Sequence, residues 1–333
     1  MSKTPYIPPY NITNAIVNLI AKISEQVVSI ASTNEVSISP HLRKNNQIRT
    51  IHSSLAIENN SLSLEQVADV INGAYVLGTP NEIKEVQNAY EAYNLLSSLD
   101  PLSINDLLKA HKTMMLGLTK EIGILRSGGV GIFAGENLVH MAPPATRIPQ
   151  LIDALFDWLK NSDVHPLIKS CVFHYEFEFI HPFADGNGRI GRLWQTLILS
   201  HWKSLFSWLP IETLIYKKQD EYYQSLAAAD KATDSTVFIE FMLCVINDTL
   251  DKFIKSDQVT AQVTVQVERL MNILGNETLS AKELLDRLNL KHRPTFSNNY
   301  LHPALNLGLI EMTVPDKPNS SQQKYRAIRS LSE

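Results

Sequence analysis

The stretch HPFADGNGRIGR, which runs from His181 to Arg192, combines a histidine, an acid, two glycines around an asparagine and two arginines. Upstream of it, apolar residues recur at helical spacing from Pro166, a residue suited to a first helical turn. Downstream, the same spacing resumes from Ile190. The sequence therefore predicts two helices joined by a turn at ADGNG, the first ending near His181 and Pro182 and the second beginning at the glycines.

The glycines of the predicted turn create a site for an anion. Gly186 and Gly188 leave backbone N–H groups uncovered at the start of the second helix, where the helix dipole is also positive. Arg189 and Arg192 lie three residues apart and project from one side of the first helical turns. Their guanidinium groups can hold further phosphate oxygens there, so the pattern predicts a phosphate site.

Two further residues complete the chemistry that the motif predicts. Asp185, directly before the glycines, is placed to hold a divalent cation against the same phosphates, because Mg²⁺ prefers carboxylate, phosphate and water oxygens. His181 has the proton affinity of a general base near neutral pH. Taken singly, these residues have ordinary explanations as turn residues, a helix cap, solvated arginines and a structural histidine. Their combination within one short stretch favours phosphoryl or nucleotidyl transfer.

The composition is that of a globular chain. Of its 333 residues, 44% are hydrophobic and 19% are charged, which is enough for two or three domains with a large core. We recognise no signal peptide and no apolar run of membrane-spanning length, so we expect a cytoplasmic protein without membrane contact. Cys171 and Cys244 lie in apolar surroundings and are expected to be buried free thiols. The net charge of −4 gives no general attraction to nucleic acid.

Helical spacing of apolar residues extends over almost the whole chain and predicts a mostly α fold. The exception is GGVGIFAGENLVHMAPP, residues 128–144, where glycines, short β-prone pieces and two prolines predict a hairpin followed by a loop. Polar residues from Lys255 to Val259 predict a short linker. Beyond it, the order helix, helix, helix, hairpin resembles a winged helix, with PTFSNNYLHPALNLG as the candidate recognition helix. The predicted regions are an N-terminal helical region (1–100), a catalytic core (101–254) and a winged-helix-like C-terminal domain (258–333).

The motif also resembles that of a known family. HPFADGNGRIGR matches every fixed position of the Fic motif, HxFx(D/E)GNGRxxR. Fic domains are mostly helical, and their best-known members transfer AMP from ATP to a hydroxyl group of a target protein. The resemblance implies that His181 deprotonates this hydroxyl and that Asp185 binds Mg²⁺. It also implies that Gly186, Asn187 and Gly188 cradle the α- and β-phosphates. Arg189 would assist them, and Arg192 would bind the γ-phosphate. Ile190 and Gly191 belong to the same predicted nucleotide-binding segment.

A second resemblance lies near residue 54. SSLAIENNSLSLEQVADVI is similar to the N-terminal-side segment of Fic proteins that carry their own inhibitor, whose pattern is [S/T]xxxE[G/N]. Ser54, Glu58 and Asn59 fit this pattern. A carboxylate at Glu58 would form a bidentate pair with Arg192 and take the place of the nucleotide's own charge. The alternative for Glu58 is a solvated helix residue.

Two weaker resemblances concern the substrates. Residues 128–144 occupy the place of the family's flap, a hairpin that aligns the target segment through backbone hydrogen bonds at a strand edge. An ordinary surface hairpin is the alternative. EYYQSLAAAD resembles the segment in which a tyrosine contacts adenine and an asparagine often follows seven residues later. Here these positions hold Tyr223 and Asp230, so the aspartate departs from the pattern, and packing roles for Tyr222 and Tyr223 stay open.

Together, the resemblances imply a protein adenylyltransferase that uses ATP and Mg²⁺ and is inhibited by Glu58. Its acceptor would be a Ser, Thr or Tyr hydroxyl of a target protein, and also of the enzyme itself. The alternative within the family is a hydrolase that removes AMP from a modified protein. From other classes, a DNA-binding regulator that senses nucleotide and a transferase with another phosphate-containing donor stay open. From residue 258 on, the chain has 9 Lys and Arg and 7 Asp and Glu, which is far from a strongly basic composition. Binding to a protein or a second copy of the chain is therefore as well supported there as binding to DNA.

Overall fold

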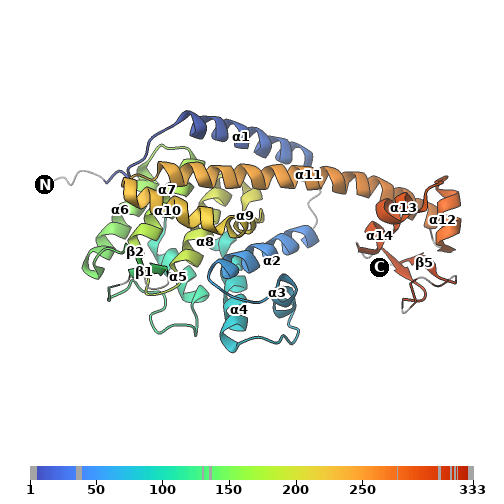
Figure 1. Cartoon of the computed structure of the whole chain (residues 1–333), viewed down its shortest axis with the longest axis horizontal. Helices are drawn as coiled ribbons and strands as arrows, with labels where there is room; N and C mark the ends of the chain where they lie inside the picture. Colours follow the sequence, from blue (N-terminus) through green and yellow to red (C-terminus); the bar gives the residue numbers. More distant parts are fainter. Residues whose placement is uncertain are drawn as a thin grey trace. The chain divides into compact units, whose positions relative to one another are not determined.

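The computed structural model describes residues 6–34, 40–129, 131–134, 137–275, 277–306, 309–315, 317–318, 320 and 322–328. The chain forms two compact units, Met1–Asp251 and Lys252–Glu333. Helices dominate both, so the predicted mostly α fold is confirmed (Figure 1). The finer division of the chain into three regions stays a prediction.

The first unit is a helical assembly with one small hairpin. Its helices are α1 (Asn14–Asn34), α2 (Pro40–Ile57), α3 (Leu64–Ile71), α4 (Pro80–Asn94), α5 (Ile104–Met114), α6 (Ile148–Asn161), α7 (Pro166–Ile180), α8 (Asn187–Trp202), α9 (Ile211–Lys217), α10 (Gln219–Ala232) and the first part of α11 (Thr236–Leu274). Short 3₁₀ turns lie at η1 (Leu96–Ser98), η2 (Ala145–Arg147) and η3 (Ser204–Ser207). The hairpin consists of β1 (Gly131–Ala134) and β2 (Asn137–Met141), paired antiparallel, so the hairpin predicted within residues 128–144 is confirmed.

The helix pair α7 and α8 forms the centre of this unit. Side chains on nearly every face of both helices are buried, which is the pattern of core helices surrounded by others. α6 packs on α7, and α2 and α5 pack on α8. Between the helices, the rings of Phe173 and Trp194 stack with centroids 6.5 Å apart, and Phe156 meets Phe173 edge-on at 5.5 Å. The loop between α7 and α8 is therefore anchored at both ends in the core.

The N-terminal helix α1 lies beside the first part of α11, as Figure 1 shows. Polar contacts join the two helices: Thr13, just before α1, donates to Glu240, and Lys22 and Gln26 of α1 both donate to Asp251. The predicted linker at residues 255–259 is wrong, because α11 continues to Leu274. No glycine or proline interrupts the sequence of this helix, so the polar residues there do not break it.

The second unit packs a short sheet against helices. Its elements after α11 are β3 (Thr278–Ser280), α12 (Ala281–Arg287), α13 (Arg293–Phe296), the π-helical stretch η4 (Ser297–Leu301), α14 (His302–Asn306), β4 (Ile310–Met312) and β5 (Lys324–Ala327). The strands pair antiparallel in the order β3-β5-β4 around a core that includes Leu270, Leu284 and Phe296. The predicted helices and C-terminal hairpin are confirmed, whereas β3 was missed because it is only three residues long. The winged-helix interpretation stays a prediction.

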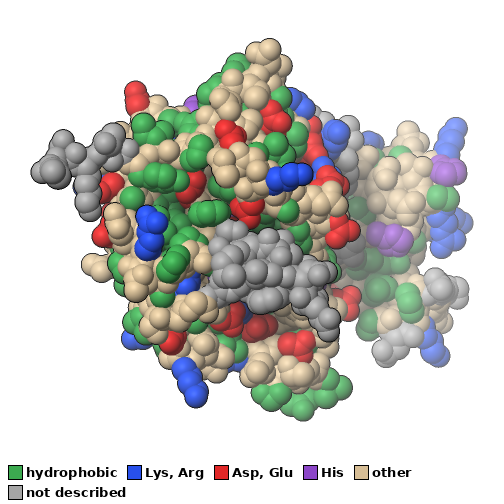
Figure 2. Space-filling model, turned by 60° about the vertical axis from the view of Figure 1, so that its left-hand side comes forward, with side chains coloured by type: hydrophobic (Ala, Val, Ile, Leu, Met, Phe, Trp, Pro, Cys, Tyr) green, Lys and Arg blue, Asp and Glu red, His purple; other side chains and the backbone are tan. Residues whose placement is uncertain are grey.

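The two cysteines behave differently. Cys171 is buried as predicted, but Cys244 is exposed, so that part of the prediction is wrong. Leu243 and Val245 on either side of it are fully buried, and the 3.6-residue period of α11 turns Cys244 away from them. On the face shown in Figure 2, acidic and basic side chains are interspersed among apolar ones. Among the described helices, none combines the length and the apolar character needed to cross a membrane.

Candidate active site

The loop from His181 to Gly186 turns the chain sharply between α7 and α8. His181 is the C-terminal cap of α7 and has a left-handed backbone, with φ of +50°. Gly186 precedes α8 and also has a positive φ, of +82°. A Cβ on Gly186 would lie 2.6 Å from Met115 Sδ, so both the conformation and the space there require glycine.

The side chain of Asn187 fixes this loop. Its Oδ1 accepts a hydrogen bond from Phe183 N at 2.8 Å, and its Nδ2 donates to Phe183 O at 2.9 Å. Phe183 is fully buried, as expected, and holds the loop against the core. Both polar groups of the Asn187 side chain are thus hydrogen-bonded to the loop, so this residue can bind an anion only through its backbone N–H.

His111, which the sequence analysis missed, contacts the loop through Phe183 and Asp185. Its ring stacks on Phe183 with centroids 3.7 Å apart and an interplanar angle of 3°. Because Gly123 N donates to Nδ1, the ring proton lies on Nε2 and is donated to Asp185 O at 3.0 Å. Burial lowers the pKa of His111, which favours this neutral form. The only sequence signal was a histidine on an apolar helix face, a pattern that fits many structural histidines.

The N-terminal turn of α8 faces the carboxylate of Glu58, the residue directly after α2. Arg192 Nη2 donates to Glu58 Oε1 at 2.8 Å, and a Cβ on Gly188 would overlap this same oxygen. The carboxylate therefore lies against the uncovered backbone of Gly188, where an anion is favoured. Arg192 directs its other contacts to Ser54, with Nε on the hydroxyl at 3.1 Å and Nη2 on the carbonyl at 2.9 Å. The expected bidentate pair is wrong in this detail, because a single hydrogen bond joins Glu58 to Arg192.

Ser54, Glu58 and Asn59 have distinct places at the end of α2. Ser54 lies one turn before Glu58 and is buried beside Arg192. The Glu58 side chain is 34% exposed. Asn59 has a φ of +67°, a conformation that glycine and asparagine adopt more readily than other residues, and it ends the helical turn. The backbone geometry thus explains why glycine or asparagine follows the glutamate in the pattern.

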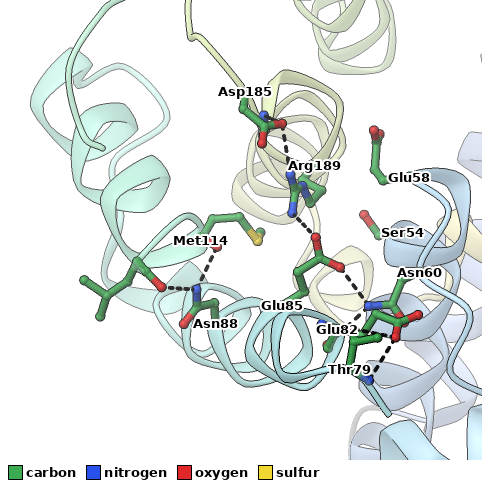
Figure 3. Close-up of polar contacts among 12 residues, drawn as sticks. Ser54, Glu58, Asn60, Thr79, Glu82, Glu85, Asn88, Met114, Asp185 and Arg189 are labelled. Carbon is green, nitrogen blue, oxygen red and sulfur yellow. Dashed lines mark hydrogen bonds and ion pairs between the residues drawn. The ribbon is translucent and has the colours of Figure 1, made fainter. Parts of the chain in front are cut away.

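A chain of polar contacts leads from Asp185 to the segment after Glu58 (Figure 3). Arg189 donates to Asp185 Oδ1 and to Glu85 Oε1, both at 3.2 Å. The second oxygen of Glu85 accepts from Asn60 Nδ2 at 2.8 Å. Glu85 and Asn60 were missed by the sequence analysis, because nothing in the sequence shows that α4 brings Glu85 within reach of both Arg189 and Asn60. They link Arg189 of the motif to the segment that follows Glu58.

The remaining motif residues are divided between site and core. The side chain of Asp185 is 57% exposed, whereas Ile190 is fully buried. Ile190 N also donates to Gly186 O, so neither its side chain nor its N–H is directed at the site. Gly191 lies against α7, where a Cβ would meet Glu178 Oε1 at 2.5 Å. The structure therefore does not place Ile190 and Gly191 at the surface that would receive a nucleotide.

His181 presents one ring nitrogen to its own helix. Nδ1 lies 3.3 Å from the backbone oxygen of Glu178. A carbonyl oxygen only accepts, so this contact places the ring proton on Nδ1 and leaves Nε2 as the basic nitrogen. In a neutral ring with its proton on Nδ1, Nε2 is the nitrogen that can accept a proton, as a general base must.

The segment expected near adenine packs in part on α2. Tyr223 is half-exposed and its hydroxyl donates to Ile57 O at 3.4 Å, directly beside Glu58. Tyr222 is buried and hydrogen-bonds His174, so packing is its role. Asp230 accepts from the Tyr175 hydroxyl at 2.9 Å.

A buried acid lies behind Arg192 on α7. Burial raises the pKa of Glu178 to about 8, and burial lowers the pKa of His174, 3.8 Å away, to about 3. At neutral pH the carboxyl is protonated and the imidazole is neutral, so the two do not form an ion pair. Glu178 Oε1 has no hydrogen-bond partner among the described residues. The sequence analysis missed this acid because its position looks like an ordinary core site.

Comparison with known proteins shows two matching family models. The Fic/DOC family model matches residues 101–199, and the model of the filamentation induced by cAMP protein Fic-like, C-terminal domain, matches residues 265–327. A crystal structure of a Fic family protein from Desulfovibrio desulfuricans G20 is 53% identical in sequence, with a TM-score of 0.76. That match covers 98% of this chain and 100% of the other.

Curated relatives carry a function in their names. Protein adenylyltransferase Fic from Nematostella vectensis is 26% identical over 217 residues, 62% of this chain and 48% of that protein. Protein adenylyltransferase fic-1 from Caenorhabditis elegans is 29% identical over 191 residues, 54% of this chain and 36% of that protein. The chain thus spans about half or less of the length of these two relatives.

We predict that Asn187→Asp destabilises the first unit. The new carboxylate would keep the acceptor for Phe183 N but would place an oxygen against Phe183 O, leaving that carbonyl unpaired at a cost of about 1–3 kcal/mol. Urea unfolding of the variant measures the loss. The exposed Asn161, whose Nδ2 also donates to a carbonyl, is the matched control as Asn161→Asp. Equal effects of the two substitutions would contradict the role given to Asn187.

We also predict a pH effect at Glu178. Because its folded pKa is raised from 4.5 to about 8, the folded state holds a proton that the unfolded state releases between these values. This contribution to stability is complete below pH 4.5 and is lost as the pH rises through about 8. In Glu178→Gln, the free energy of unfolding should therefore fall less steeply over this range than in the parent. Unfolding curves at several pH values test this, with the exposed Glu221→Gln as control, and an unchanged slope in Glu178→Gln would refute it.

Proposed function

The chain belongs to the Fic family, and on this basis we propose that it is a protein adenylyltransferase. It would transfer AMP from ATP to a Ser, Thr or Tyr hydroxyl of a target protein. The names of the curated relatives support this activity. The observation that carries the proposal is the carboxylate of Glu58 bound at Gly188 and Arg192, because it marks a built anion site at the start of α8.

The phosphates of ATP would bind where this carboxylate now lies. The N-terminal backbone of α8 supplies N–H donors and the positive end of the helix dipole. Arg192 would hold the γ-phosphate through its guanidinium group, and Arg189 would assist from the neighbouring turn. Both arginines are almost fully buried, so their charge is poorly screened by water and acts strongly on a bound anion.

His181 would act as the general base. In the proposed step the target hydroxyl gives its proton to Nε2 of His181, its oxygen forms a bond to the α-phosphorus, and the bond from that phosphorus to the bridging oxygen of pyrophosphate breaks. The leaving pyrophosphate carries away the β- and γ-phosphates that the α8 terminus and Arg192 hold. The chemistry is thus mostly positioning and charge stabilisation.

The residues present fit a magnesium ion. Mg²⁺ is held in such sites by one or two carboxylates together with substrate phosphates and water, and Asp185 offers one exposed carboxylate beside the phosphate site. Among the described residues, no cluster of three His, Cys, Asp or Glu side chains forms a site that would bind a metal alone. Mg²⁺ bound at Asp185 would neutralise phosphate charge.

Inhibition by Glu58 forms part of the proposal. With its carboxylate on Arg192, the γ-phosphate of ATP cannot take the same position, and the α-phosphate would be poorly aligned for attack by the target hydroxyl. The resting enzyme would therefore be slow. Self-modification, a homodimer, DNA binding through the C-terminal unit and a cytoplasmic location stay predictions from the sequence.

We predict that Glu58→Gly increases AMP transfer, including transfer onto the protein itself. A hydrogen bond to a charged group contributes about 1.5–3 kcal/mol, so its removal should raise the rate by about 10- to 100-fold. ATP labelled at the α-phosphate measures the gain, and ATP labelled at the γ-phosphate should give no label. Glu58→Gly combined with Arg192→Ala should lose the gain, because Arg192 holds the γ-phosphate. A folded Glu58→Gly protein no faster than the parent would sink the inhibitory role and favour removal of AMP from a modified protein.

We predict that His181→Ala in the Glu58→Gly background binds ATP as its parent does but transfers AMP about 10²- to 10⁴-fold more slowly. The phosphate contacts come from α8 and its arginines, and not from the imidazole. Calorimetric titration with ATP and Mg²⁺ gives the affinity, and the α-phosphate label gives the rate. Undiminished labelling would reject His181 as the base.

A further inference from the structure

A buried arginine at the base of the hairpin has no place in the motif. The side chain of Arg126 is 3% exposed. Its Nε donates to His181 O at 2.6 Å, and its Nη2 donates to Ile180 O at 3.4 Å. The same guanidinium group donates to Gly128 O at 2.7 Å through Nη1 and to Pro143 O at 2.6 Å through Nη2.

These acceptors belong to two parts of the proposed active site. Gly128 lies just before β1 and Pro143 just after β2, so they mark the two ends of the hairpin. Ile180 and His181 form the end of α7, where the proposed base lies. The backbone joins the same parts, because Arg126 N donates to Pro182 O at 2.9 Å. One side chain therefore ties both ends of the hairpin to the backbone of His181.

The buried charge is satisfied without an acid. Among the described residues, no carboxylate forms an ion pair with Arg126, and its hydrogen bonds go to carbonyl oxygens. Two of these carbonyls lie at the C-terminal end of α7, where the helix dipole is negative and favours a cation. Burial lowers the pKa of Arg126, but arginine stays protonated in proteins. A lysine ammonium is a point charge and cannot span carbonyls on three separate segments.

We propose that Arg126 is a positioning residue for the acceptor side of the reaction, and this inference rests on the function proposed above. It fixes the hairpin that would align the target segment relative to the base that takes the target's proton. A target hydroxyl bound along the hairpin then meets His181 in one geometry. The nucleotide side is independent of it, because Arg189 and Arg192 take their partners from α2, α4 and the motif loop.

If Arg126 has this role, its substitution should lower the rate of AMP transfer without changing the affinity for ATP. In the Glu58→Gly background, Arg126→Met should lower self-transfer of AMP by about tenfold or more, since small misplacements of reacting groups cost that much. Arg126→Lys should fall between Met and Arg. The affinity for ATP with Mg²⁺, measured by calorimetry, should stay the same in both variants. The exposed Arg147, which follows the hairpin, is the matched control as Arg147→Met and should change neither quantity.

Hydrogen exchange tests the positioning without any need for activity. Amides of β1, β2 and the end of α7 with its cap His181 (residues 178–181) should exchange about tenfold faster in Arg126→Met, as expected when a local opening loses a shared anchor, while those of α8 keep their protection. Unchanged exchange in the hairpin would overturn the proposal. A fall in ATP affinity equal to the fall in transfer would also overturn it, because Arg126 would then support the fold in general.

The design separates this proposal from the proposed function. If the Glu58→Gly parent transfers no AMP, the adenylyltransferase assignment fails, and the exchange comparison alone decides whether Arg126 anchors the hairpin to His181. If the parent transfers AMP and Arg126→Met transfers it equally fast, the function stands and the role of Arg126 is wrong.

Discussion

The buried charge of Arg192 is the constraint around which the site is built. A guanidinium group cannot give up its proton in a protein, so its burial in α8 must be matched by oxygen atoms nearby. α2 supplies the hydroxyl and carbonyl of Ser54, and Glu58, directly after α2, supplies its carboxylate. A phosphate group would satisfy the same need. The segment that carries Ser54 and Glu58 meets this electrostatic requirement although it lies far from the motif in the sequence, and in the proposed function the phosphates of ATP would meet it instead.

The loop around this charge is held mainly by side chains that satisfy backbone groups. Asn187 binds both polar backbone atoms of Phe183, His111 binds the carbonyl of Asp185, and Arg126 binds that of His181. A loop without regular structure leaves its N–H and C=O groups unpaired, and burial makes each unpaired group costly. These few contacts fix the backbone of His181 and of the residues that lead into α8.

The features that could be predicted from the sequence are those that depend on a few neighbouring residues. The helices on both sides of the motif, the hairpin and the burial of Phe183 all follow from periodicity and from glycine or proline signals over a few residues. Contacts between distant segments left no such signal: Glu85 and Arg126 look like ordinary charged residues until the fold brings a carboxamide or a carbonyl to them. The linker at residues 255–259 was wrongly predicted because a short run of polar residues occurs in helices as well as in loops. Cys244 was predicted to be buried because its neighbours in the sequence are apolar. The helical period, and not the neighbours, decides which way its side chain points.

The two oxygens of Glu85 have a consequence for how this protein can vary. One accepts from Arg189 in the motif and the other from Asn60, two residues after Glu58. A shorter acid or an amide at this position would leave at least one of the two partners without an acceptor. Asn60, Glu85 and Arg189 are therefore expected to vary together. Related chains that keep the segment around Glu58 should keep all three residues, and chains without that segment are free to change Asn60 and Glu85.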